Sequence, residues 1–435
     1  MRTFLAGLIA IVLATPLFAE VKIEEVTTEK GFEAWLVEEP SIPFTALEIR
    51  FRGGTSLDVD GKRGAIYLMT ALLEEGAGDL DARAFARELE GLAASFSYDA
   101  GDDTVSISAR FLSENRDEAM ALLRQTLHAP RFDQDAIDRV RSQILSGLAS
   151  DAKDPDEIAS AAFARIAYGD HPYGTDGKGS IESVSALSRD DILEAHRNVF
   201  ARDRVYVGAV GDITASDLSV LIDDLLGDLP AEGRAFPEKI DVSFDRGETV
   251  VDFDTPQSVA IFAQRGIERD DEDFFAAFIL NHILGAGGFE SRLMTEVREK
   301  RGLTYGIYTY LAPKDYAEVY VGRVSSSNDR IAEAIAVTRA EWERIARDGV
   351  TEKELSDAKT FLTGAYPLRF DGNARIASII VGMQMQDLGL DYIATRNDQV
   401  NAVTLEEINR VAAELYDPEN LHFVVVGRPE GLGTN

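Results

Sequence analysis

The pattern of apolar and polar positions repeats itself once along this chain. Residues 188–199 have a helical pattern that begins with a serine and acidic residues, and they lead into the continuous apolar run 205–211. Residues 404–415 begin with a threonine and two glutamates and lead into a similar run, 421–427. A hydroxyl cap followed by acidic residues is typical of a helix start, and a continuous apolar run predicts a strand buried on at least one face. Because the copies lie about half the chain apart, they predict two homologous domains of roughly 200 residues each.

Further strands and helices are expected inside each half. Strand-like stretches lie at residues 45–51, 104–111, 249–253 and 258–263, and amphipathic helices are expected at 115–127, 134–149 and 328–348. This order predicts an α+β fold in which each domain is a mostly antiparallel sheet with helices packed on one face. A stretch rich in proline and glycine between the halves is typical of a linker. The predicted organisation is a first domain at 20–228, a linker at 229–244 and a second domain at 245–435.

The first 19 residues have the layout of a secretory signal peptide. Met1 and Arg2 give a positive start, an apolar run follows from Phe4 to Leu13, and Ala19 is a small residue at a suitable cleavage point. The run is too short to span a bilayer comfortably, which disfavours the alternative of a retained membrane anchor. We therefore expect cleavage after Ala19, export to a periplasmic compartment, and no stable membrane anchor in the mature chain.

The charge balance argues against several classes of partner. The chain has 44 lysines and arginines against 76 aspartates and glutamates, which gives a formal net charge of −32. A surface this acidic repels phosphate backbones and anionic lipids, so no nucleic-acid partner is expected. The absence of cysteine excludes disulfides, thiolate metal sites and a cysteine nucleophile.

The histidines form no recognisable zinc motif. No two of the five lie within ten residues of each other, and neither H-x-x-E-H nor H-x-x-x-H occurs; they are His128, His171, His196, His282 and His422. A composite site built from distant histidines stays open, although a lone histidine is more often structural. A serine-nucleophile elbow and a phosphate-binding loop are also missing.

Motifs in both halves resemble the insulinase/pitrilysin-like metallopeptidases. The first half contributes Gly53–Asp58, Gly64-Ala65 at a helix start, Glu74–Ala77 and the turn His171–Gly174. In the second half, the glycine-rich segment Leu284–Leu293 precedes Val297–Tyr305, which resembles the family's Arg/Tyr motif. The resemblance covers essentially the whole chain after residue 19 and agrees with the internal repeat.

The zinc motif of that family is missing from this chain. The resemblance places H-x-x-E-H at Tyr67, Thr70 and Ala71, and it places the third ligand, a glutamate on a later helix, near Gly147. Residues 67 and 71 share one face of a helix and could both reach a metal if they were histidines. A phenol and a methyl group do not make a zinc site, and threonine and glycine supply no carboxylate. We therefore expect no zinc or other cofactor in this chain.

The resemblance implies that the opposite side of the family's site is retained in Arg298 and Tyr305. In active relatives such a pair faces the zinc and contacts the substrate backbone, where a fixed guanidinium and phenol can stabilise charge on a peptide carbonyl oxygen. The glycine-rich segment is expected to bind an extended peptide together with the nearby sheet edge; its predicted substrate-binding residues are Gly285, Gly287, Gly288 and Ser291. The alternative, a solvated charge run beside a strand aromatic, stays open.

These features predict a division of labour between two chains. Bacterial relatives of this kind are two-subunit peptidases in which one chain carries the zinc helix and the other carries the Arg/Tyr pair. This chain is expected to be the zinc-less subunit, which does not hydrolyse peptides alone, and its partner a homologous H-x-x-E-H chain whose Zn²⁺ polarises water. Two alternatives remain: a non-catalytic scaffold that binds peptide or protein, and an enzyme with an unfamiliar metal site.

Overall fold

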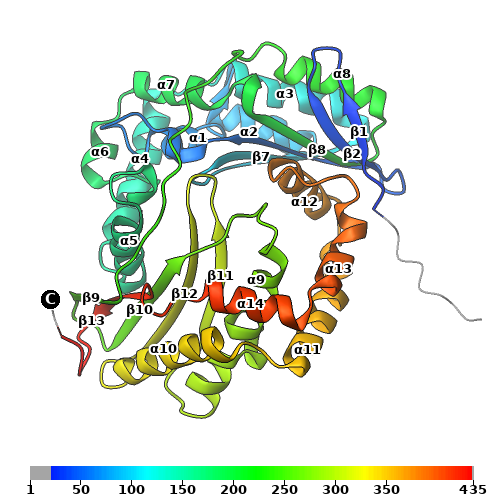
Figure 1. The fold of residues 1–435 in the computed structure, drawn as a ribbon. Helices are drawn as coiled ribbons and strands as arrows, with labels where there is room; N and C mark the ends of the chain where they lie inside the picture. The colour runs from blue at the N-terminus through cyan, green and yellow to red at the C-terminus, as the bar shows by residue number, and fades with distance from the viewer. Residues whose placement is uncertain (1–20, 434–435) are drawn as a thin grey trace, which may run out of the picture.

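The computed structural model describes residues 21–433, which form two halves that each centre on one β-sheet (Figure 1). The predicted signal peptide at residues 1–19 lies outside the described residues. The first sheet has the strand order β1-β2-β8-β3-β7-β6, and the second has the order β11-β12-β10-β13-β9. The strands of the first sheet are β1 (Glu24–Thr27), β2 (Glu33–Glu38), β3 (Phe44–Arg52), β6 (Ser95–Ala100), β7 (Thr104–Leu112) and β8 (Val205–Gly211). Those of the second sheet are β9 (Gly247–Asp252), β10 (Gln257–Arg265), β11 (Ile307–Pro313), β12 (Glu318–Ser327) and β13 (His422–Gly427).

The two sheets repeat one topology. In the first sheet β8 lies between β2, to which it is parallel, and β3, to which it is antiparallel. In the second sheet β13 lies between β9 and β10 in the same relation. The other strand pairs of these two sheets are antiparallel. Because β8 and β13 are the two apolar runs of the sequence repeat, the predicted duplication and the α+β class are both confirmed.

Helices cover the outer face of each sheet, with α1, α2, α3, α7 and α8 above the first sheet and α10 below the second (Figure 1). The helices of the first half are α1 (Ala65–Ala71), α2 (Ala82–Gly91), α3 (Arg116–His128), α4 (Gln134–Asp151), α5 (Pro155–Tyr168), α6 (Ile181–Ala186), α7 (Arg189–Val199) and α8 (Ala215–Leu226). Those of the second half are α9 (Phe274–Asn281), α10 (Ile331–Asp348), α11 (Glu352–Gly364), α12 (Asn373–Met385), α13 (Tyr392–Ala402) and α14 (Leu405–Leu415). A short ribbon of β4 (Gly76–Ala77) and β5 (Leu80–Asp81) follows α1.

The repeated helices α7 and α14 both begin with a capping box. Ser188 accepts from the amide of Asp191, and Thr404 accepts from the amide of Glu407, while each acidic side chain reaches back to the cap. These contacts satisfy amides that a helix start leaves free. Within residues 21–433, no helix is both long enough and apolar enough to cross a membrane.

The first half lends one helix to the inner face of the second sheet. Helix α5 buries Ala159, Ala167 and Tyr168 in one apolar cluster with Val259 of β10 and Val319 of β12. Proline at its first position and an Asp154 cap start this helix where the chain leaves α4. The second sheet is therefore covered on both faces along part of its width.

In the reciprocal contact, α12 of the second half packs on the inner face of the first sheet. Ala377, Ile380 and Met383 pack against Trp35 of β2 and Val210 of β8. Helix and strand approach closely because β8 has a glycine at position 208, where a Cβ would lie 2.7 Å from a methyl of α12. The sequence analysis expected helices on one face of each sheet, and this exchange of α5 and α12 is an additional feature.

The hairpins β6–β7 and β11–β12 meet at their turns, between the halves. The Lys314 ammonium binds the Asp102 carboxylate, and Arg52 lies 3.6 Å from the Asp315 carboxylate. Lys314 also lies over the ring of Tyr173, 3.7 Å from its centroid. These hairpins occupy equivalent places at one end of each sheet, so the contact joins equivalent parts of the two halves.

A buried carboxyl group completes this junction. Tyr173 donates its hydroxyl to Asp103 and accepts the amide of Tyr316 at 3.3 Å. Burial raises the pKa of Asp103 to about 6, although the Tyr173 hydroxyl and the Lys314 ammonium oppose the shift. The junction therefore contains a group that titrates in a mildly acidic range.

Replacement of Asp103 by asparagine should change how stability depends on pH. The pKa of Asp103 in the folded state lies above its ordinary 3.8, so folding favours the protonated carboxyl. The resulting stabilisation is present near pH 4 and is lost as the pH rises through about 6. The amide of the Asp103→Asn variant does not titrate. Its free energy of unfolding relative to that of the wild type should therefore rise by up to about 3 kcal/mol from pH 4 to pH 7. The measurement is the Tm of both proteins across that range.

The matched control is Asp99→Asn, which removes an exposed carboxylate from the same hairpin. Its Tm difference from the wild type should stay flat with pH. An Asp103→Asn difference that is equally flat would contradict the buried titration.

Candidate functional site

The helix that would carry a zinc motif has no metal ligands. On α1, Tyr67 is half-buried and Ala71 is exposed, while Thr70 is buried and its hydroxyl has no hydrogen-bond partner among the described residues. Gly147 lies on α4, which packs against α1, and a Cβ at this position would meet no atom within 4 Å. Nowhere in residues 21–433 do three or more histidine, aspartate or glutamate side chains form a group suited to a metal ion. The residues at this place do not fit zinc, because none supplies an imidazole or a carboxylate.

The glycine-rich segment is shaped by close packing. A π-helical turn (His282–Ala286) continues α9, and Gly285 within it lies against β11 so tightly that a Cβ would be 2.3 Å from Thr309 Oγ1. Gly288 has a φ of +60°, the left-handed region that favours glycine. At Gly287 a Cβ would lie 2.7 Å from the carbonyl oxygen of His282. These glycines let the chain turn beside the edge of the second sheet.

Ser291 lies beneath this turn rather than on its surface. It is 1 % exposed, its hydroxyl donates to the Gly288 carbonyl at 2.8 Å, and it accepts the amide of Met294 at 3.4 Å. The structure thus shows Ser291 holding the turn together. The substrate-binding role assigned from the sequence to Gly285, Gly287, Gly288 and Ser291 stays a prediction.

Arg298 differs from its charged neighbours. It lies in a second π-helical segment (Met294–Glu299), a distortion that is frequent at functional sites. Lys300 and Arg301 both pair with Glu296, at 2.6 and 2.8 Å. No carboxylate lies within ion-pair distance of Arg298 among the described residues, and its guanidinium carbon instead lies 4.4 Å from the ring centroid of Phe289. The neighbouring cations are neutralised locally, whereas the charge of Arg298 is available to an outside group.

Tyr305 projects from a backbone that is firmly held on either side. Leu303 is buried and its carbonyl accepts from Ser326, while Thr304 Oγ1 donates to the Ser325 carbonyl at 2.7 Å. Arg330 donates to the Gly302 carbonyl at 2.8 Å. The Tyr305 side chain itself is 89 % exposed. No hydrogen bond joins it to Arg298 within residues 21–433.

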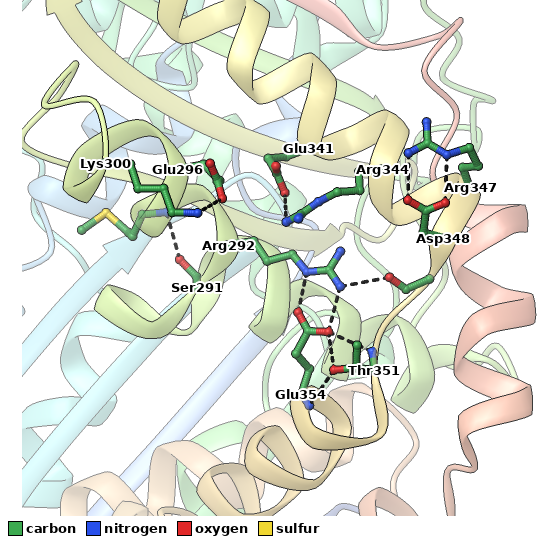
Figure 2. Close-up of polar contacts among 12 residues, drawn as sticks. Ser291, Arg292, Glu296, Lys300, Glu341, Arg344, Arg347, Asp348, Thr351 and Glu354 are labelled. Carbon is green, nitrogen blue, oxygen red and sulfur yellow. Dashed lines mark hydrogen bonds and ion pairs between the residues drawn. The ribbon is translucent and has the colours of Figure 1, made fainter.

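Arg292 anchors the whole segment to α11. Figure 2 shows its guanidinium facing the Glu354 carboxylate, with N–O distances of 2.7 and 2.9 Å, and donating to the Gly349 carbonyl at 3.0 Å. Glu354 also closes the capping box of α11 with Thr351. Burial alone would raise the pKa of Glu354, but the hydrogen bonds from Arg292 and Thr351 overcome it and lower the pKa to about 2. The pair is therefore ionised at neutral pH, and it fixes the segment that carries Arg298 to α11.

The edge strand of the second sheet lies beside this segment. Among the described residues β11 pairs with β12 alone, and the amide of Ile307 donates to Met294 Sδ at 3.5 Å. Tyr308 and Tyr310 are about half-exposed and stack on the same face of β11, with ring centroids 6.5 Å apart. Tyr308 lies opposite Arg323, which binds Asp156 of the first half at 2.9 Å, so this face looks toward the other half.

Three supporting residues were not found from the sequence. Phe289 lies beneath Arg298, and Arg292 and Glu354 form the anchor. The only local signal was the capping pattern of a threonine at 351 followed by a glutamate three residues later. Its pairing with Arg292 is a tertiary contact that no local pattern encodes.

Taken together, the fold and this site define a class: a duplicated metallopeptidase-type scaffold without its metal ligands. Two family profiles match the chain. "Insulinase (Peptidase family M16)" matches residues 34–176, and "Peptidase M16 inactive domain" matches residues 186–362. The chain belongs to the insulinase family, peptidase family M16, as an inactive member.

Several relatives match along nearly their whole length. A protein of Helicobacter pylori described as "Non-peptidase homolog YmxG" is 28% identical over 391 residues, covering 89% of this chain and 90% of that protein. A Bacillus subtilis protein described as "Uncharacterized zinc protease YmxG" is 23% identical over 404 residues, covering 91% and 96%. The crystal structure of a peptidase M16 inactive domain from Pseudomonas fluorescens is 28% identical, with a TM-score of 0.86 and coverage of 95% and 99%.

A Gly285→Ala substitution should destabilise the site. The new methyl carbon would lie 2.3 Å from Thr309 Oγ1 and 2.9 Å from its backbone nitrogen, so the π-helical turn or β11 must move. We expect a loss of about 1–3 kcal/mol in the free energy of unfolding, measured by urea denaturation. Gly147→Ala is the control, since it enters open space on a helix and should gain about 0.5–1 kcal/mol. Equal effects at both positions would refute the packing role of Gly285.

Restored ligands should create a zinc site if the four positions correspond to the family motif. The triple variant Tyr67→His, Ala71→His, Gly147→Glu would offer two imidazoles on one helix face and a carboxylate from the adjacent α4. We expect the purified variant to bind Zn²⁺ stoichiometrically, measured by elemental analysis after dialysis. The double variant without Gly147→Glu should bind more weakly. Equal zinc affinity in both would show that residue 147 does not face α1.

Proposed function

We propose that this chain is the zinc-less subunit of an exported two-subunit metallopeptidase. It binds a peptide substrate and stabilises the scissile carbonyl at a zinc site provided by a homologous H-x-x-E-H partner. The observation that supports this most directly is the contrast between its two half-sites. Helix α1 has Tyr67, Thr70 and Ala71 at the zinc-motif positions, whereas Arg298 has no carboxylate partner within residues 21–433 and Tyr305 is 89 % exposed.

The proposed role of each group follows from its donor chemistry. Arg298 and Tyr305 donate to the carbonyl oxygen as it gains negative charge, and fixed donors are effective because they need little reorganisation. The edge strand β11 supplies backbone donors and acceptors to an extended peptide. The partner's zinc would supply activated water. Export to the periplasm is part of the proposal and rests on the signal-peptide pattern of residues 1–19.

A second candidate is a non-catalytic scaffold of the same fold. It is favoured by the description of the Helicobacter pylori relative as a non-peptidase homolog. In that case the segment that carries Arg298 and Tyr305 would bind peptide or protein, and Arg298 would contribute to binding alone. The two functions differ in whether loss of Arg298 or Tyr305 changes turnover.

The test is co-expression with an H-x-x-E-H homologue from the same source and an assay of peptide cleavage by the purified complex. Arg298→Ala and Tyr305→Phe should each lower kcat/KM by on the order of 10²–10³, the usual cost of removing one donor from an oxyanion site. Each isolated chain should be inactive.

Arg301→Ala is the matched control, because Arg301 belongs to the same charge run but pairs with Glu296, which keeps Lys300 as a partner. Its kcat/KM should stay close to that of the wild type. A stable complex whose turnover is unaffected by the Arg298 and Tyr305 variants would support the scaffold instead. Cleavage by the isolated chain would overturn both candidates.

A further inference from the structure

A separate cavity lies between α9, α12 and α13, away from the zinc helix. Figure 1 shows these three helices on the same side of the molecule. The cavity has a volume of about 370 Å³, within the range of small-molecule sites. Its aromatic walls are Phe274, Phe275, Phe278, Tyr366, Phe370 and Tyr392. Three arginines also line it: Arg269, Arg369 and Arg396.

The three guanidinium groups line the cavity without a carboxylate partner among the described residues. Arg396 is 5 % exposed and donates to the Leu362 carbonyl at 2.9 Å and to an amide oxygen of Asn397 at 3.0 Å. Arg269 donates to the Tyr392 hydroxyl at 2.8 Å. Within the described part of the chain, no aspartate or glutamate lies within ion-pair distance of Arg269, Arg369 or Arg396.

The phenol of Tyr366 lies in the same cavity wall as these arginines. Burial raises the pKa of Tyr366 to about 12, with a contribution from nearby Tyr392, while the positive charges of Arg396, Arg369 and Arg269 oppose the shift. Tyr366 thus lies within electrostatic reach of all three guanidinium groups. Burial also lowers the pKa of Arg396, as expected for a cation that has no anionic neighbour.

This arrangement is unusual for so acidic a chain. With 76 acidic residues against 44 basic ones, partners for arginine are abundant. Some other arginines that stack on aromatic rings do reach one: Arg204 reaches Asp203 at 2.9 Å, and Arg339 reaches Glu248 at 2.8 Å. Buried charges are normally paired, so the cavity has the charge balance of a site that takes its anion from solution.

The walls restrict which anion fits. Six aromatic rings, together with Ile379, Met383 and Leu388, offer broad apolar surfaces. Arginine forks match a planar carboxylate by paired hydrogen bonds. A phosphate is also matched by arginine, but it carries more charge and would leave the apolar walls without a partner. The complementary ligand is a single carboxylate attached to an aromatic or branched apolar group.

We propose that this cavity binds the carboxylate of an apolar molecule, with Arg269, Arg369 and Arg396 holding the carboxylate and the aromatic walls holding its apolar body. Two sources share this chemistry: a free aromatic or branched carboxylic acid, and the last residue of a peptide with an apolar C-terminus. The cavity adjoins a second one on the inner face of the first sheet, and Ser378 of α12 lines both. A ligand could therefore enter from the space between the halves.

The test is isothermal titration calorimetry on the purified single chain, without partner or zinc, so it is independent of the proposed peptidase role. The probes are N-acetyl-phenylalanine, its neutral amide, inorganic phosphate, and a short peptide ending in phenylalanine. N-acetyl-phenylalanine should bind, and the amide should bind about tenfold more weakly or worse, because it loses the charge-assisted hydrogen bonds. Tighter binding of the peptide than of the free acid identifies a peptide C-terminus as the source, and the reverse identifies a small acid; either result supports the site.

Variants locate the binding. Arg369→Gln changes an exposed residue and should fold, and Arg269→Gln provides a second position if Arg396 proves essential for folding. Each should weaken the binding of N-acetyl-phenylalanine about tenfold. Arg375→Gln, on an exposed part of α12 outside the cavity, should leave this affinity unchanged. The proposal is overturned by any of three results: no binding of N-acetyl-phenylalanine, equal binding of its amide, or affinities unchanged in both cavity variants. Phosphate that binds more tightly than the carboxylate and competes with it would also overturn it.

Discussion

The exchange of α5 and α12 is the interaction on which the rest of the structure depends. Each helix buries apolar side chains on the sheet of the other half, so the halves cannot part without exposing residues such as Trp35 and Ile380 to water. Burial of one large apolar side chain contributes roughly 1.5–3 kcal/mol, and several are buried on each side. The junction of the β6–β7 and β11–β12 hairpins adds a polar contact between the same halves. These contacts therefore fix the position of one sheet relative to the other.

That rigidity determines what the candidate site can do. The Arg298–Tyr305 segment is fixed to α11 through Arg292 and Glu354 and to β12 through Thr304. Donors held in advance can stabilise a developing charge without paying the cost of ordering them. The same scaffold has no group that activates water at the equivalent of the zinc helix, because a tyrosine, a threonine and an alanine stand there. Under the proposed function, these donors hold the carbonyl and the nucleophile comes from the partner subunit.

Much of the fold was accessible from the sequence because its signals are local. Strands β8 and β13 and their capped helices were recognised from apolar runs and from Ser188 and Thr404, and the structure confirms their equivalence. The covering of each sheet by a helix from the other half was not accessible. Helix α5 presents mostly small residues such as Ala159 and Ala167, which do not reveal the sheet on which they pack. The cavity arginines stand at positions 269, 369 and 396, and no motif connects them; only the fold brings them together.

The arginines that stack on aromatic rings show how charge is distributed in this molecule. Arg52, Arg204 and Arg339 stack on a ring and also lie within ion-pair distance of a carboxylate. Arg269, Arg298 and Arg396 stack on a ring, and no carboxylate of residues 21–433 lies within ion-pair distance of them. A ring face orients a guanidinium but does not neutralise it. A buried positive group without an internal partner is costly unless an outside negative charge meets it, and Arg396 is 5 % exposed. A developing oxyanion would meet the charge of Arg298, and a bound carboxylate would meet the charges of Arg269 and Arg396.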